Sequence, residues 1–264
     1  MEIIFYSSII IIIFLIYRYG LFLFNYKGIP VLMYHKISEF HRDKLTVTVN
    51  QFENQINYLL KKGYTPISFK ELNSYKNNTL NIPDKPVILT FDDGYMNNYE
   101  LAYPVLKKNN IKATIFLVAG SIGKKNEWDE GQEKLIDYNQ IKEMSGNNIE
   151  FGIHSFNHSN FSKMTIKEIE SDLTDCISEL KKNNIFFENV IAYPYGSIPE
   201  KPEDKNKLKD FLKKHNFNFG LLIKSKINKI PIKNPYFMYR INIKGSDSFL
   251  DFKIKLKNGR SKLF

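Results

Sequence analysis

The sequence contains a single cysteine, Cys176, in 264 residues. One thiol cannot form an internal disulfide, so the fold has no covalent cross-link of its own. Zinc fingers and iron–sulfur centres are excluded as well, because both need several thiolates. Any metal must therefore be held by histidine and carboxylate side chains, and the chain has only five histidines.

Glycine and proline are sparse too, with 13 and 10 residues, which excludes collagen-like and linker-type chains. Hydrophobic residues make up 43% of the chain and aromatic residues 14%, a content that excludes a disordered protein. The net charge is +10, but the basic residues are scattered and form no run with interleaved aromatic residues. We therefore expect no nucleic-acid partner.

The N-terminal segment is strongly apolar. Residues 3–17 carry no charge, Arg18 follows, and the apolar character continues to Phe24. About 20 helical residues cross a bilayer core, so we predict a transmembrane signal-anchor over residues 1–26, followed by one folded domain over residues 27–264. The alternatives are a buried core helix and a cleaved signal peptide, although the segment lacks a positive n-region and a small-residue cleavage site.

Apolar runs alternate with helical patterns along the rest of the chain. Capping boxes formed by Asn50 with Glu53 and by Thr165 with Glu168 predict the starts of two helices, and Cys176 falls on the buried face of the second. Strands are expected at residues 31–37, 87–91, 112–119, 149–154, 190–193, 219–223 and 237–243. This alternation predicts an α/β fold of βαβ units around a parallel sheet, closed into a distorted or partial (β/α) barrel.

Polar clusters follow three of these strands, where a barrel collects its chemistry. They read Thr90-Phe91-Asp92-Asp93-Gly94, His154-Ser-Phe-Asn-His158 and Ala192-Tyr193-Pro194-Tyr195-Gly196. Adjacent carboxylates at the end of an apolar strand are costly unless they are paired or bind a cation. Two imidazoles four residues apart can converge on one metal. Each cluster alone also fits a plain turn, since Asp-Gly and Pro-x-Gly are common turn sequences.

Taken together, in this order, the three clusters resemble the polysaccharide deacetylases of carbohydrate esterase family 4, the NodB-homology domain. The resemblance covers roughly residues 30–243. Lesser matches are the strand VLMYHKI at residues 31–37, the helix at residues 52–64 and the segment ATIF at residues 113–116. The Tyr-His pair in the first strand resembles the branch that deacetylates poly-N-acetylglucosamine.

The resemblance implies a distorted (β/α) barrel and a metal-dependent carbohydrate N-deacetylase. One divalent metal would be held by Asp93, His154 and His158. Zinc is expected first, with cobalt, nickel or iron as alternatives, because this donor set accepts all of them. Asp92 would be the general base.

Other site residues follow from the same resemblance. The backbone N–H of Tyr195, in the motif with Pro194, would lie at the oxyanion and substrate position. His35 is the candidate general acid, because the late Leu-x-x-His motif of many members has no equivalent here; the alternative is a histidine buried in the core. Ala192 stands where many members carry an arginine paired with the catalytic aspartate, and we expect Arg240 to supply that charge instead.

The expected partners are an N-acetylated amino-sugar glycan or glycolipid and the membrane. A lipid-linked N-acetylhexosamine, of polyprenyl-phosphate or lipopolysaccharide type, suits a compact anchored domain, whereas the early Tyr-His strand favours an N-acetylglucosamine polymer. Alternative functions are a non-catalytic anchored glycan-binding protein and a metal amidase acting on a small non-sugar amide.

The expected location is the bacterial inner (cytoplasmic) membrane, with a single pass and the catalytic domain on the extracytoplasmic side. The positive-inside rule conflicts with this orientation, because Arg18, Lys27 and Lys36 follow the apolar segment.

Overall fold

The computed structural model describes residues 2–19, 28–129 and 132–261. Its α-helices are α1 (Glu2–Tyr19), α2 (Val49–Lys61), α3 (Phe69–Lys76), α4 (Tyr103–Lys108), α5 (Tyr138–Met144), α6 (Ile166–Lys182), α7 (Pro202–Lys214) and α8 (Phe249–Asn258). Its strands are β1 (Gly28–Ile29), β2 (Val31–Tyr34), β3 (Lys36–Ser38), β4 (Thr46–Thr48), β5 (Thr65–Pro66), β6 (Pro86–Phe91), β7 (Ala113–Leu117), β8 (Ile149–Ile153), β9 (Val190–Ala192), β10 (Phe219–Ile223), β11 (Asn228–Lys229) and β12 (Met238–Asn242).

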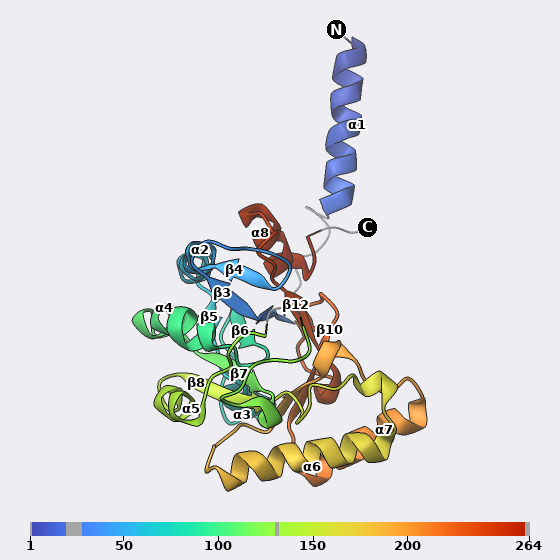
Figure 1. The fold of residues 1–264 in the computed structure, drawn as a ribbon. Coiled ribbons are helices and arrows are strands. Elements are labelled where there is room, and N and C mark those ends of the chain that lie inside the picture. The colour runs from blue at the N-terminus through green and yellow to red at the C-terminus, as the bar shows by residue number, and fades with distance from the viewer. Residues whose placement is uncertain (1, 20–27, 130–131, 262–264) are drawn as a thin grey trace.

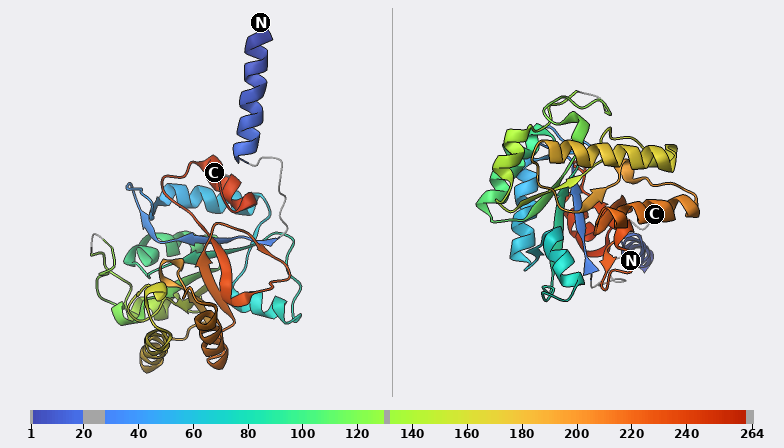
Figure 2. Two further views of the ribbon diagram at one scale, coloured as in Figure 1. Left: turned by 90° about the vertical axis from the view of Figure 1, so that its right-hand side faces the viewer. Right: turned by 90° about the horizontal axis from the view of Figure 1, so that it is seen from below.

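Seven parallel strands close into a barrel. The ring runs β2-β6-β7-β8-β9-β10-β12 and returns to β2, which pairs with both β6 and β12. The short β5 adds to β6 outside the ring. Helices surround the strands, with α2 and α8 at one end of the body in Figure 1 and α6 beside α7 at the other, as the left view in Figure 2 also shows. The predicted α/β class and barrel architecture are confirmed.

Side-chain alternation along the strands separates the barrel interior from the surrounding helices. Ile88 belongs to an inner apolar cluster that draws on six of the seven barrel strands, whereas Leu89 and Phe91 pack in the larger cluster beneath the helices. Because successive side chains of a strand point to opposite faces, Asp92 continues the inward set of residues 88 and 90. The end of β6 therefore aims a carboxylate into the mouth of the barrel.

One large ring of the barrel interior, that of Phe116, lies opposite a glycine. A Cβ at Gly152 would come 2.5 Å from the Phe116 ring, so only glycine leaves room for this phenylalanine in the packed interior. The base of the barrel is covered by α3, where Phe69 contacts Phe116 and Phe219 at ring-centroid distances of 6.2 and 5.7 Å. Phe116 thus forms a firm floor beneath the residues at the barrel mouth.

The first predicted strand, residues 31–37, is broken at His35. β2 ends at Tyr34, and β3 begins at Lys36 and pairs with β4 instead of continuing in the barrel. The prediction of a single strand was wrong because one apolar run serves two separate pairings. The break leaves His35 at the barrel mouth.

Helix starts were predicted with mixed success. Thr165 and Glu168 form the capping box of α6, as expected. The box at the start of α2 was predicted two residues too late, because Thr48 and Gln51 form it rather than Asn50 and Glu53. Both pairs fit the sequence pattern, and β4 ends at Thr48, which makes this residue the cap.

The N-terminal helix α1 covers Glu2–Tyr19 and rises away from the body of the molecule (Figure 1). Within the described residues we find no helix with the length and apolar character that a membrane crossing requires. The predicted transmembrane helix over residues 1–26 is therefore not found; residue 1 and residues 20–26 of that prediction lie outside the described residues.

Candidate metal centre and active site

Two adjacent carboxylates follow β6 and point to different partners. Asp93 has a φ of +73°, a left-handed conformation that aspartate tolerates better than most residues. This turn separates its side chain from that of Asp92, although both are almost fully buried, with 4% and 1% exposure. The motif therefore presents two carboxylates with separate surroundings.

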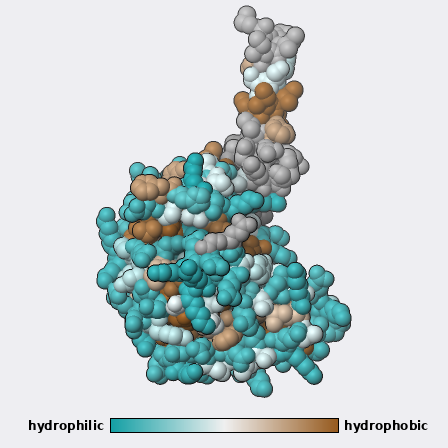
Figure 3. All heavy atoms as spheres, viewed as in Figure 1, coloured by the Kyte–Doolittle hydropathy of each residue, from teal (hydrophilic) through white to brown (hydrophobic). Residues whose placement is uncertain are grey.

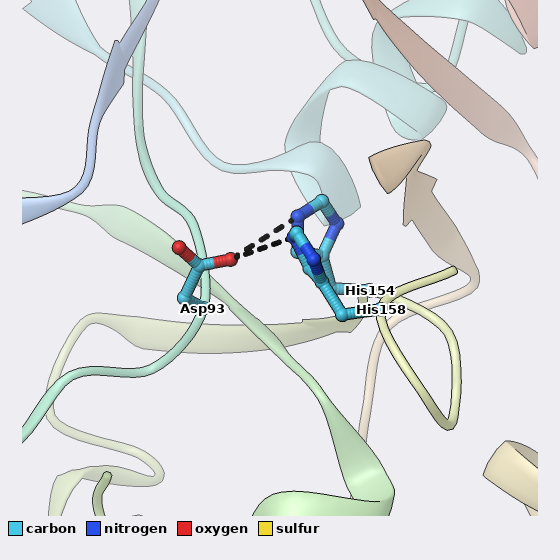
Figure 4. A group of neighbouring side chains, drawn as sticks. All are labelled: Asp93, His154 and His158. Atoms are coloured by element: carbon cyan, nitrogen blue, oxygen red, sulfur yellow. Dashed lines mark ion pairs between the residues drawn. The ribbon is translucent and has the colours of Figure 1, made fainter. Parts of the chain in front are cut away.

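Asp93 meets two imidazoles that come from the end of β8 (Figure 4). Its Oδ1 lies 3.4 Å from Nε2 of His154 and 3.2 Å from Nε2 of His158. One ligand atom from each residue lies within 4.8 Å of the other two. The three residues named by the sequence as metal ligands are thus brought together by the fold.

This group fits a divalent metal. Two ligands bound at about 2.1 Å in a tetrahedral site stand about 3.4 Å apart, which matches the spacing of the Asp93 oxygen from both nitrogens. Oδ1 of Asp93 is buried and accepts no hydrogen bond from the described residues. Burial disfavours the charged Asp93, but the two histidines more than offset this and hold its pKa well below the usual range. The carboxylate is therefore in the form that a cation needs.

His154 is oriented by a hydrogen bond behind it. Its Nδ1 lies 2.7 Å from the carbonyl oxygen of Ala192. Because a carbonyl only accepts, Nδ1 carries a proton, and Nε2 is the ring nitrogen available to a metal ion. Such a contact fixes the tautomer and direction of a metal-ligating histidine. Ala192 therefore contributes through its backbone, although its side chain cannot replace the family's arginine.

Asp92 is held by Arg240, which comes from β12. The guanidinium Nη1 lies 2.5 Å from Oδ1 of Asp92, and Arg240 is fully buried above the Phe116 ring. Burial alone would raise the pKa of Asp92, but the positive charge of Arg240 outweighs it and holds the pKa below its ordinary value. The lone arginine singled out in the sequence thus lies at the expected carboxylate.

His35 lies on the other side of Asp92. Its Nε2 is 4.0 Å from Oδ2 of Asp92, and Nε2 of His154 is 3.9 Å from the same oxygen. The His35 side chain is 12% exposed, so it lines the mouth of the barrel rather than packing in the core. Oδ2 of Asp92 therefore faces the space between two imidazoles.

The third motif forms a turn after β9. Tyr195 has a φ of +57° and follows Pro194 in a short 3₁₀ turn. The Tyr195 ring meets the edge of His158 at a centroid distance of 4.8 Å and is 51% exposed. This contact places the Tyr195 side chain next to His158, one of the three candidate metal ligands.

Sequence reasoning missed the group that shapes the loop between the two histidines. Asp172 of α6 accepts hydrogen bonds from the backbone N–H groups of Phe156 and Asn157, at 2.8 and 3.1 Å. The hydroxyl of Ser155 accepts one from the N–H of His158 at 2.9 Å. Ser155 and His158 both have positive φ, a strain that these bonds offset. The sequence does contain one signal for this role, because Asp172 is a carboxylate among the apolar residues on the buried face of α6.

Replacement of Asp172 by asparagine is expected to weaken the metal centre. An asparagine oxygen can accept from one of the two loop N–H groups, and the other loses its partner, at a cost of about 1–3 kcal/mol. We expect Zn²⁺ affinity to fall about tenfold, measured by competition with a chromophoric chelator. Asp175→Asn, on the exposed side of the same helix, should bind Zn²⁺ like the original chain. Equal affinities for the two variants would contradict the role of Asp172.

Comparisons with known proteins agree with this geometry. The family model described as polysaccharide deacetylase matches residues 79–216. A poly-beta-1,6-N-acetyl-D-glucosamine N-deacetylase of Staphylococcus aureus is 32% identical over 223 residues, which cover 81% of this chain and 72% of that protein. YxkH of Bacillus subtilis is 35% identical over 174 residues, covering 65% of this chain; the chain spans 58% of the length of YxkH.

Solved structures show the same fold. IcaB from Ammonifex degensii has a TM-score of 0.73 and 25% identity, with 87% of this chain and 96% of that chain covered. The Streptococcus pyogenes deacetylase PplD, in complex with acetate, has a TM-score of 0.71 and 24% identity, with 88% and 98% covered. The barrel, the family model and the staphylococcal relative lead to one conclusion: the chain belongs to the polysaccharide deacetylase family.

Proposed function

We propose that this protein is a metal-dependent N-deacetylase that removes acetyl groups from N-acetylglucosamine units of a cell-envelope polysaccharide. The observation that carries the proposal is the meeting of Asp93, His154 and His158 with Asp92 and His35 alongside. The family supplies the reaction class. The staphylococcal relative, whose name specifies a poly-beta-1,6-N-acetyl-D-glucosamine substrate, supports a polymer over a lipid-linked sugar.

A divalent metal, in our proposal zinc, held by the three ligands would supply a Lewis acid that lowers the pKa of a bound water and polarises the acetamide carbonyl. Asp92 is not among the ligands, and its low pKa keeps it ionised, so Oδ2 can accept the proton of the attacking water. His35, across from Asp92, then donates a proton to the departing amine. The backbone N–H of Tyr195 donates a hydrogen bond to the developing oxyanion.

Deacetylation should depend on the three ligands and on the metal. We expect the purified chain with one equivalent of Zn²⁺ to release acetate from β-1,6-linked N-acetylglucosamine oligomers. Chelation or Asp93→Ala should lower the rate at least about 10³-fold, because the carbonyl loses its main electrostatic stabilisation. The exposed Asp84→Ala serves as the control.

Four outcomes separate the rival functions. Full activity after chelation would contradict a metal mechanism. Acetate release from small amides but not from oligomers would indicate an amidase. Zinc binding without hydrolysis of oligomers, of small amides or of a polyprenyl-phosphate N-acetylhexosamine would indicate a glycan-binding protein. Hydrolysis of the polyprenyl-phosphate sugar alone would show that the substrate is a lipid-linked sugar rather than a polymer.

Arg240 is expected to set the charge state of Asp92. In Arg240→Gln the Asp92 carboxylate loses its positive partner, so its pKa rises and the proton-accepting form is lost at a higher pH than in the original chain. We expect kcat at neutral pH to fall about 10²-fold and the acidic limb of the pH–rate profile to move to higher pH. Arg240→Lys should retain more activity. An unmoved acidic limb in Arg240→Gln would show that Arg240 acts through structure alone.

We propose that the protein acts at the bacterial cell envelope, with its catalytic domain on the outer side of the cytoplasmic membrane. The outer orientation follows from the proposed envelope substrate. Attachment to the membrane is supported by the apolar side-chain surface of α1, where Phe5, Ile10 and Ile13 are 64%, 67% and 59% exposed; the coloured turns of this helix contrast with the mostly hydrophilic body in Figure 3. A chain lacking residues 1–27 should move from the membrane fraction to the unbound fraction. Full-length chain in the cytosol, protected from protease added to spheroplasts, would contradict this location.

A further inference from the structure

The two histidines of the metal centre are oriented in different ways. His154 donates from Nδ1 to the carbonyl of Ala192 at 2.7 Å. Nδ1 of His158 is buried and has no hydrogen-bond partner among the described residues. Metal-ligating histidines almost always use their second nitrogen for such a bond, because it fixes the direction of the ring. Something else must therefore hold the ring of His158.

Aromatic rings enclose His158 where the hydrogen bond is missing. The indole of Trp128 stacks on the imidazole, with centroids 4.5 Å apart and planes 26° from parallel. The ring of Tyr195 meets it edge-on at 4.8 Å. A stacked partner on one side and an edge on the other restrict rotation of the imidazole, and the geometry directs Nε2 towards Asp93, 3.2 Å away.

Trp128 is placed by an ion-pair cluster at the next residue. Nζ of Lys36 lies 3.0 Å from Oδ2 of Asp129 and 2.7 Å from Oε1 of Glu133. Lys36 is 7% exposed. Burial alone would lower its pKa, but the two carboxylates more than offset this and raise the pKa above its usual value. The lysine therefore remains charged and ties the segment around Trp128 to β3.

The same cluster extends to the residues that follow the catalytic aspartates. The hydroxyl of Tyr95 donates to Oδ2 of Asp129 at 2.9 Å, and Nζ of Lys36 lies 4.7 Å from the centre of the Tyr95 ring. The side-chain amide of Asn126 donates to the other oxygen of Asp129. The backbone N–H of Ile136 donates to the carbonyl of Gly94 at 2.9 Å. The segment that carries Trp128 is thus fastened on both sides to the Asp-Asp-Gly turn and to β3.

We propose that Lys36 and Asp129 are positioning residues that hold Trp128 against His158, and that this stacking gives the second histidine the fixed direction that the Ala192 carbonyl gives the first. Trp128 acts on the metal ligand through packing and touches no reacting atom. The inference rests on the proposed function only in taking the Asp-His-His group to bind metal, and its test measures binding rather than hydrolysis.

The experiment uses the full chain and Zn²⁺ itself. Zn²⁺ affinity is measured by competition with a chromophoric chelator for the original chain, Lys36→Met, Trp128→Leu and Trp128→Phe. We expect about tenfold weaker binding for Lys36→Met and Trp128→Leu. Trp128→Phe should stay within about threefold of the original chain, because phenylalanine still offers a ring for stacking. Lys134→Met is the matched control, an exposed lysine of the same segment, and should bind Zn²⁺ normally.

A second readout separates positioning from a general loss of stability. Trp128 is the only tryptophan in the chain, so tryptophan emission, excited at a wavelength that tyrosine does not absorb, reports on this residue alone. In zinc-free protein, Lys36→Met should shift the emission to longer wavelength and increase quenching by acrylamide, because Trp128 becomes more exposed. Lys134→Met should change neither quantity.

The outcomes are distinguishable. Zn²⁺ affinity within twofold of the original chain for both Lys36→Met and Trp128→Leu would overturn the proposal, and so would unchanged emission in Lys36→Met. An original chain that binds no Zn²⁺ would overturn the metal centre itself, and with it this proposal. Normal Zn²⁺ binding by the original chain together with normal binding by the variants would overturn only the role of Trp128 and Lys36.

Discussion

The architecture of the site follows from one constraint, the burial of two neighbouring negative charges. Moving an ion out of water costs several kcal/mol even after the protein relaxes, and Asp92 and Asp93 are both almost inaccessible. The left-handed turn at Asp93 resolves the conflict, because it gives each carboxylate its own positive or cation-binding partner. Arg240 neutralises Asp92, and the imidazoles of His154 and His158 face Asp93.

Barrel geometry explains why residues so distant in sequence meet at this point. Inward positions alternate along each strand, and the last inward positions of β2, β6, β8 and β12 lead to His35, Asp92, His154 and Arg240. The interior below must be solid for this layer to keep its place. Phe116 provides that support, and it fits because residue 152 is glycine. Packing deep in the barrel and charge placement at its mouth are therefore parts of one arrangement.

The residues that ended up together were largely predictable, because strand ends in a parallel barrel converge on one edge. Asp93, His154 and His158 stand in motifs at such ends, and Arg240 was conspicuous as a charge in an apolar strand. The positions of Asp172 and Trp128 could not be predicted in this way, because both act through loops whose conformation no local pattern specifies. The break at His35 was also hidden, since a continuous apolar run gives no sign that its second half pairs outside the barrel.

The closure of the barrel by β2 against β12 has a consequence for the nascent chain. The first and last strands of the ring come from opposite ends of the domain, and His35 and Arg240 lie on or beside them, both outside the span of residues 79–216 that matches the family model. Non-local pairings of this kind slow the folding of a domain. A nascent chain that ends before β12 contains both aspartates and both histidines but not the arginine that neutralises Asp92. The charge pair that makes Asp92 useful therefore joins two distant parts of the chain and requires β12.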